Sequence, residues 1–216
     1  RSRAKFYACV TIAPGTSRSY HRDAACSRSG LSSASSSVWR SSVSGRPPNL
    51  TDVSELREIP DNQEVFAHPH TDQSLIVELL EYQGQVADQH AARYHFEDIA
   101  GSNEAREPGA FEVGDVVALP KAEMSLSECS SAWVLKGTQC VSKFNEEARN
   151  TVNVHLGLFR LPQFSTDVLI TFNDPQSISP DSSSASAAET HGQPWTVEDF
   201  RRTLLSLTLH NPGLFG

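Results

Sequence analysis

The chain has 216 residues, 38% of them apolar, which is enough for one sizeable hydrophobic core with appendages. Its net charge of −8 divides unevenly: residues 1–46 carry eight basic residues against one acidic residue, and residues 47–216 carry 10 basic against 25 acidic residues. The phosphates of nucleic acid repel a body with a net charge of −15, so we expect a basic protein surface as its partner. No apolar run approaches the roughly 20 residues of a membrane-spanning helix.

The first 46 residues differ in kind from the rest of the chain. They contain 13 serines and no apolar periodicity, so we assign residues 1–46 to a disordered or foreign segment and residues 47–216 to one folded domain. Abundant Arg and Ser with little acid is also typical of organelle transit peptides, and the apolar run 6–13 resembles a signal-peptide core. We favour an incomplete or alternative N-terminus over either targeting role.

Cysteine and histidine spacing gives no strong sign of a disulfide or a metal site. None of the four cysteines belongs to a Cys-x-x-Cys pair, so we expect free thiols in a reducing compartment, with a Cys129–Cys140 disulfide as the alternative. His68 and His70 would project from one side of an extended segment, as metal ligands do, but no third ligand is specified. We therefore predict no metal. His95 is interpreted as a packed or rim histidine.

The first half of the body predicts a hairpin followed by a helix. Residues 64–68 and 74–81 are strand candidates, the second a nearly continuous apolar run typical of a central strand, with turn residues between them. Apolar residues spaced four and three apart then predict a helix of three to four turns, capped by Asp88 and ended by Gly101. Residues 102–131 are interpreted as loop, with a short helix near 122–129.

The second half predicts three more antiparallel strands. Residues 152–159 and 167–173 show the two-residue alternation of a strand, and 133–144 is a third strand candidate, interrupted near Gly137. Residues 174–194, rich in serine, proline and glycine, are expected to form a surface excursion.

A last helix begins at Thr196, where Asp199 completes a capping box. Asn211-Pro212 is predicted to end it, and Leu214-Phe215 to fold back onto the core. Its apolar stripe comprises Val197, Phe200, Leu204 and Leu207. Strands in a continuous meander with helices on the faces predict an α+β fold, a sandwich of α/β/α type around a mainly antiparallel sheet.

The segment 52–66 concentrates acidic residues around a proline. Acids recur at every third position, and Val53, Leu56 and Ile59 recur with the same spacing as candidate anchors. This spacing predicts that the carboxylates share a solvent-facing side and bind a basic partner; the alternative is a polar turn between two elements. The acids of this repeat are Asp52, Glu55, Glu58, Asp61 and Glu64.

Motifs of enzymatic chemistry are missing from the sequence. There is no Gly-x-x-x-x-Gly-Lys-Ser/Thr loop, no Gly-x-Gly-x-x-Gly turn, no Gly-x-Ser-x-Gly elbow and no His-Glu-x-x-His helix. We therefore predict a protein that is not an enzyme and that holds no cofactor of its own.

Five stretches, at 52–66, 71–81, 92–98, 161–164 and 209–216, together closely resemble the Ran guanine-nucleotide release factor family, over roughly residues 47–216. The resemblance implies a monomeric, non-enzymatic partner of the GTPase Ran that promotes loss of bound guanine nucleotide and regulates nuclear protein import, in the nucleus and cytoplasm. It implies a fold similar to an extrinsic photosystem II subunit. For vertebrate members it also implies binding to the cardiac voltage-gated sodium channel and help in its delivery to the cell surface.

The family motif Pro-Asp-x-Gln-Glu is matched by residues 60–64, so the resemblance implies that Asp61 and Glu64 contact Ran, with Arg57 and Glu58 as secondary candidates. Family members begin with a Leu-Phe/Tyr-Gly-Gly-Ala strand, and this chain has serine-rich sequence in its place, so one sheet strand is expected to be absent. Two alternatives remain open: an adaptor that binds a channel or transport receptor without exchange activity, and a plastid protein of the photosystem-subunit type.

Overall fold

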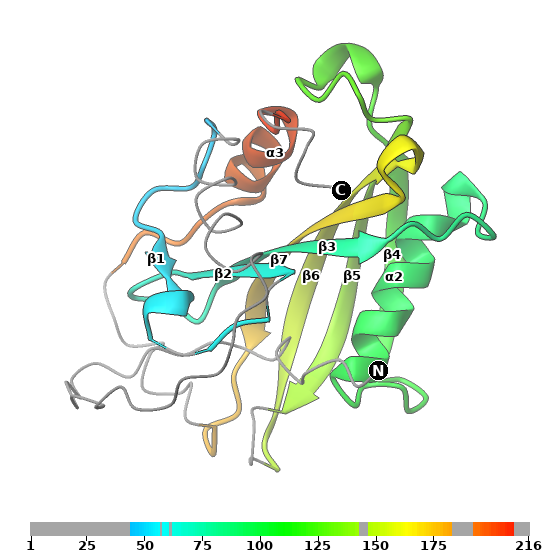
Figure 1. Cartoon of the computed structure of the whole chain (residues 1–216). Coiled ribbons are helices and arrows are strands. Elements are labelled where there is room, and N and C mark those ends of the chain that lie inside the picture. Colours follow the sequence, from blue (N-terminus) through cyan, green and yellow to red (C-terminus); the bar gives the residue numbers. More distant parts are fainter. Residues whose placement is uncertain (1–43, 57, 61, 143–146, 183–191, 210–216) are drawn as a thin grey trace, which may run out of the picture.

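The computed structural model describes residues 44–56, 58–60, 62–142, 147–182 and 192–209. Within them, seven strands form one antiparallel sheet in the order β1-β2-β3-β7-β6-β5-β4 (Figure 1). The strands are β1 (Thr51–Asp52), β2 (Gln63–Ala67), β3 (Ser74–Glu81), β4 (Phe111–Ala118), β5 (Ser131–Ser142), β6 (Arg149–Leu161) and β7 (Thr166–Ser177). The helices are α2 (Asp88–Ser102), α3 (Val197–Leu205) and the short 3-10 turns η1 (Val53–Glu55), η2 (Lys121–Glu123) and η3 (Pro162–Phe164).

The sheet consists of two meanders joined at its centre. β1, β2 and β3 pair in succession, β4 to β7 pair in succession, and the β3–β7 pair unites the two groups. Helix α2 carries the chain from the central strand β3 to the edge strand β4. The predicted hairpin of residues 64–68 and 74–81 and the three antiparallel neighbours β5, β6 and β7 are confirmed.

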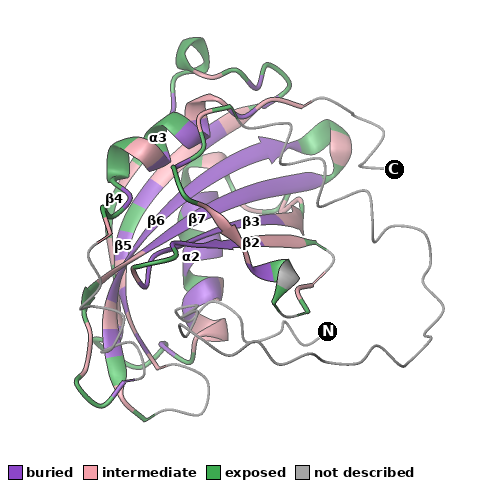
Figure 2. Cartoon of the chain, turned by 90° about the vertical axis from the view of Figure 1, so that its left-hand side faces the viewer, coloured by how far each residue is buried: buried purple, intermediate pink, exposed green. Residues whose placement is uncertain are grey.

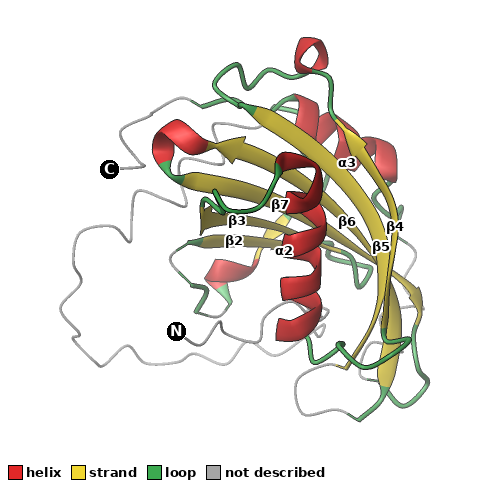
Figure 3. Ribbon diagram, turned by 90° about the vertical axis from the view of Figure 1, so that its right-hand side faces the viewer, coloured by secondary structure: helices red, strands yellow, loops and turns green. Residues whose placement is uncertain are grey.

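In the described part of the chain, one α-helix lies on each face of the sheet. Figure 3 shows α2 lying across one face, where Phe96 and Ile99 belong to the same apolar cluster as Val65 and Leu156. Figure 2 shows α3 on the other face, over the largely buried central strands, where Phe200 packs in a cluster with other aromatic and aliphatic side chains. These two layers of core confirm the α+β sandwich that the sequence predicts.

Strand β5 runs through Gly137 without the predicted interruption. A Cβ built at Gly137 would lie 2.5 Å from Cζ of Phe96 and 2.6 Å from the carbonyl oxygen of Glu112. The glycine therefore lets the α2 ring and the neighbouring strand β4 approach β5 closely, and it does not break the strand.

Several other local predictions are wrong. Residues 111–118, expected to be loop, form the edge strand β4, and the short helix expected near 122–129 is only the three-residue turn η2. The N-cap of α2 is Ala87, without a side-chain hydrogen bond, and Gly101 lies inside the helix. In β4 the register shifts between Val113 and Val116, so its apolar residues do not keep a period of two.

Helix α3 has the predicted capping box, in which the Thr196 hydroxyl accepts from the Asp199 amide and the Asp199 carboxylate accepts from the Thr196 amide. The helix ends at Leu205, well before Asn211-Pro212, which lie outside the described residues together with Leu214-Phe215. Of its predicted stripe, Val197 is exposed because it occupies the first turn, at the rim of the core.

The N-terminal segment can be compared with the predictions only in part. Residues 1–43 lie outside the described residues, so the expected absence of a first family strand stays a prediction.

In the described part, neither α2 nor α3 has the length and apolar character of a membrane-crossing helix.

Candidate functional site

Glu64 is the second residue of β2, on one side of the sheet. It lies opposite Val77 of β3 and is half-buried. On the outer side of β2, β1 pairs only with Phe66 and Ala67. Among the described strands, the segment carrying Glu64 is therefore paired with β3.

A turn at Pro60 leads the chain into β2. The amide of Gln63 donates to the carbonyl of Pro60 at 2.9 Å, which closes the turn, and Ile59 packs against the core on the α2 side. Asn62 is bonded twice to Leu79 of β3: its carbonyl accepts from the Leu79 amide at 2.9 Å, and its side-chain Nδ2 donates to the Leu79 carbonyl at 3.0 Å. The corner is thus fixed to a central strand.

A partly buried side-chain hydrogen bond holds the first residue of β2. Nε2 of Gln63 donates to Oε1 of Glu78 at 2.9 Å, and the two residues are direct cross-strand partners. Glu78 is only 2% exposed although it is a carboxylate. Because a carboxylate can only accept, the NH₂ group of Gln63 must face it, which fixes the rotation of the amide.

The acidic residues around this corner do not form one face of a regular helix. Asp52 belongs to β1 and caps η1, with Oδ1 accepting from the amide (2.9 Å) and hydroxyl (2.6 Å) of Ser54. Glu58 is exposed, whereas Glu64 is half-buried in a strand. Leu56 is 59% exposed and does not anchor the segment, because the three-residue period holds only within η1.

Two of the four predicted contact residues, Arg57 and Asp61, lie outside the described residues, as does the side chain of Glu55. The described part of the chain therefore places Glu64 and Glu58 on the two sides of the Pro60 turn. The sequence prediction gave no role to Asn62, Gln63 or Glu78. One signal was visible: Glu78 is a charged residue within the otherwise apolar run 75–80.

His68 is a structural residue. Its Nδ1 accepts from the backbone amides of His70 (3.1 Å) and Thr71 (3.0 Å), and its Nε2 lies 3.0 Å from the carbonyl of Gln193. Both ring nitrogens are therefore occupied, and His68 is not available as a metal ligand. His95, also buried, has Nε2 3.1 Å from Oδ2 of Asp167, which confirms that it is a packed histidine.

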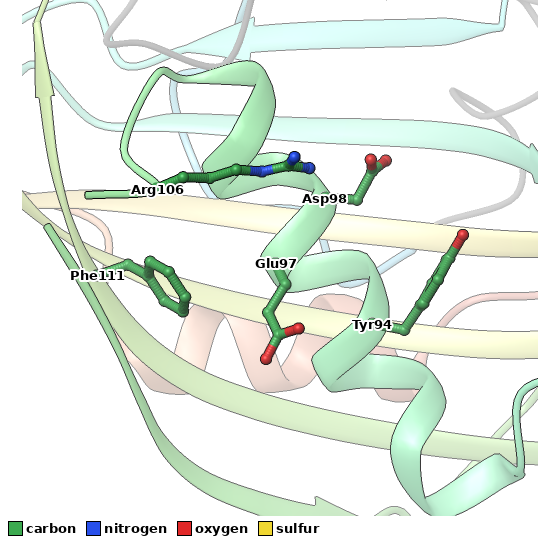
Figure 4. Close-up of a pocket in the computed structure, with 5 residues that line it drawn as sticks. All are labelled: Tyr94, Glu97, Asp98, Arg106 and Phe111. Atoms are coloured by element: carbon green, nitrogen blue, oxygen red, sulfur yellow. The ribbon is translucent and has the colours of Figure 1, made fainter. Parts of the chain in front are cut away.

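A shallow pocket of about 410 Å³ lies between α2 and β4 (Figure 4). Its lining combines the aromatic rings of Tyr94 and Phe111 with charges of both signs. The guanidinium of Arg106 lies directly over Gly101, where a Cβ would be 2.1 Å from Nε. The charged groups of the lining are Glu97, Asp98 and Arg106.

Residues 43–175 match the family described as "Ran-interacting Mog1 protein". The chain belongs to the Mog1 family. It is 64% identical over 170 residues to the Ran guanine nucleotide release factor of Danio rerio, a match that covers 79% of this chain and 92% of the relative. To the protein of the same name in Homo sapiens it is 48% identical over 172 residues, covering 79% and 89%.

More distant members share the fold. The nuclear import protein mog1 of Schizosaccharomyces pombe is 35% identical over 133 residues, covering 60% of this chain and 70% of the relative. The crystal structure of the Saccharomyces cerevisiae Ran-binding protein Mog1p superimposes with a TM-score of 0.57 at 22% identity, covering 79% of this chain and 90% of that chain. The α+β architecture of this chain is therefore the fold of the Mog1 family, and the Pro60 corner lies inside the region matched to it.

Proposed function

We propose that this chain binds the GTPase Ran and promotes release of its bound guanine nucleotide, in support of nuclear protein import. Membership of the Mog1 family supports the proposal, because vertebrate relatives are named Ran guanine nucleotide release factors and a yeast relative is named a nuclear import protein. Action in the nucleus and the cytoplasm follows from the proposal, and fractionation of the tagged protein between the two compartments tests it.

Release of a nucleotide requires no covalent chemistry. A protein that binds the nucleotide-free GTPase more tightly than the loaded GTPase shifts the equilibrium toward nucleotide loss. The residues 47–216 carry a strong surplus of acid, which steers them toward basic surfaces at a rate that falls with salt.

We assign the principal contacts to Glu64 and Asp61, and secondary contacts to Glu58 and Arg57. The observation that carries this assignment is the position of Glu64 at the start of β2, directly after the Pro60 turn and inside the region matched to the Mog1 family. In the proposed mechanism these carboxylates engage basic groups of Ran near its phosphate and magnesium site. They thereby compete for contacts that the nucleotide otherwise holds.

Charge reversal tests the assignment. The double variant Asp61→Lys/Glu64→Lys is expected to abolish the accelerated release of a fluorescent guanine nucleotide from Ran. The matched control is Glu112→Lys/Asp115→Lys, which makes the same change in charge at exposed positions of the opposite edge strand β4. Unchanged release with the first variant would remove both acids from the mechanism, and equal losses with both variants would point to net charge alone.

Binding to the cardiac sodium channel, implied by the resemblance to vertebrate members, stays a prediction of a different class. It treats the protein as a trafficking adaptor. Capture of nucleotide-free Ran by the purified chain distinguishes the two functions, because an adaptor without exchange activity leaves nucleotide release unchanged even where it captures the channel.

A further inference from the structure

We infer that Gln63 and Glu78 are positioning residues that hold Glu64 in the orientation its partner requires. This inference rests on the proposed function of Glu64. It starts from the 2.9 Å bond between Nε2 of Gln63 and Oε1 of Glu78, which joins the first residue of β2 to the buried interior of β3.

Stability of the core does not account for a carboxylate at position 78. Side chains alternate along β3, so Glu78 lies on the same face as Ile76 and Leu80, which pack in the apolar cluster under α2. Burial of a charged group is costly unless it is hydrogen-bonded, and an apolar side chain at this position would extend the core. The hydrogen bond that the Glu78 carboxylate accepts from Gln63 therefore explains this residue better than apolar packing does.

The pair acts on Glu64 through the backbone. Gln63 and Glu64 are adjacent in a strand, so their side chains project from opposite faces: that of Gln63 toward the α2 side, that of Glu64 toward the α3 side. Fixing the Gln63 side chain to β3 therefore fixes the backbone from which Glu64 projects. Neither Gln63 nor Glu78 needs to contact the partner.

Asn62 holds the same stretch from the turn side. Its two bonds to Leu79 and the bond between Gln63 and Glu78 attach consecutive residues to consecutive residues of β3. These attachments restrain the backbone that leads into Glu64. A site that is rigid before binding loses less conformational freedom on binding, which strengthens affinity without a new contact.

The test is a double-mutant cycle between positions 78 and 64, read out as affinity for nucleotide-free Ran and as urea stability. Glu78→Leu is expected to weaken binding about tenfold, and Glu78→Gln, which keeps an oxygen acceptor for Gln63, to restore most of the affinity. In a Glu64→Gln background, Glu78→Leu is expected to have little further effect, because no carboxylate remains to be positioned. Gln63→Met removes the same hydrogen bond and leaves the buried residue at position 78 unchanged. It replaces Glu78→Leu in the test if that variant fails to fold.

The outcomes separate the two proposals. If Glu64→Gln leaves affinity unchanged, the proposed role of Glu64 is wrong and the positioning pair is overturned with it. If Glu64→Gln weakens binding while Glu78→Leu and Gln63→Met do not, the positioning role alone is overturned. The positioning role is also overturned if Glu78→Leu weakens binding as much in the Glu64→Gln background as in the wild type. Gln63 and Glu78 would then act independently of Glu64.

Discussion

Arg160 and Asp167 face each other across β6 and β7 in the interior, with Nε of Arg160 3.2 Å from Oδ1 of Asp167 and neither side chain exposed. The same guanidinium donates from Nη1 to the Val86 carbonyl (2.8 Å) and to Oδ1 of Asp88 (2.6 Å), and from Nη2 to the Gln83 carbonyl (2.7 Å). One buried arginine therefore ties the loop between β3 and α2 to the sheet.

Neutralising the aspartate of this pair is expected to destabilise the protein strongly. Asp167→Asn removes the fully buried one of the two carboxylates paired with Arg160 and leaves only the partly exposed Asp88. Breaking a buried ion pair typically costs about 3–5 kcal/mol of unfolding free energy. Urea unfolding measures it. The control is Glu123→Gln, which breaks the surface ion pair with Arg201 and is expected to cost at most about 1 kcal/mol. Similar losses of unfolding free energy for the two variants would contradict a stabilising role for the buried ion pair of Arg160 and Asp167.

The two glycines of the central strands should differ in their tolerance of a methyl group. A Cβ at Gly137 meets the Glu112 backbone carbonyl at 2.6 Å, whereas a Cβ at Gly157 meets the tip of the Leu204 side chain, which can rotate away. Gly137→Ala is expected to cost about 1–3 kcal/mol and Gly157→Ala less, as measured by urea unfolding. A larger loss at Gly157 would mean that the Leu204 side chain is more rigid than the backbone of β4.

Elements whose signals are local could be predicted from the sequence. The bounds of β3 were predicted to the residue because an apolar run is framed by turn residues, and the start of α3 because its capping box lies within four residues. Strand β4 was missed because an exposed, bulged edge strand has neither a steady period nor a continuous apolar run. Asp88 was assigned to a cap, but in the fold it binds Arg160, 72 residues away in sequence.

The candidate site was predictable only as a motif. The carboxylate of Glu64 and the turn at Pro60 follow from adjacent residues, so the sequence indicated both. The bonds that hold them, from Gln63 to Glu78 and from Asn62 to Leu79, depend on the register of two strands. A shift of one residue in that register would exchange the faces of all these side chains, and the pattern of acids alone contains no information about it.

Stability is expected to fall as the pH is lowered below about 6.5. Burial lowers the pKa of His68 from its ordinary 6.5, with a smaller effect of the neighbouring His70, and burial also lowers the pKa of His155. The unfolded chain therefore takes up protons near pH 6.5 that the native protein resists. Between pH 6.5 and the lowered native pKa of each histidine, that histidine makes the unfolding free energy fall by at most about 1.4 kcal/mol per pH unit. Urea unfolding at a series of pH values between 7.5 and 5 measures the combined slope.

His68→Asn separates the contribution of His68. The asparagine Oδ1 can accept from the amides of His70 and Thr71, as Nδ1 of His68 does, but it does not titrate. The variant is expected to show a shallower fall in stability between pH 7.5 and 5. An unchanged slope would show that protonation of His68 is not coupled to unfolding.

The two described cysteines should react with alkylating agents at very different rates. Burial raises the pKa of the Cys129 thiol to about 11, and its Sγ donates to the Ser131 carbonyl at 3.0 Å. At pH 8 about one Cys129 in a thousand is then a thiolate, the reactive form. Cys140 is only half-buried. Iodoacetamide at pH 8, followed by peptide mass mapping, is expected to modify Cys140 first and to modify both at similar rates in urea. Faster modification of Cys129 in the native protein would mean that the 119–130 segment opens away from α3.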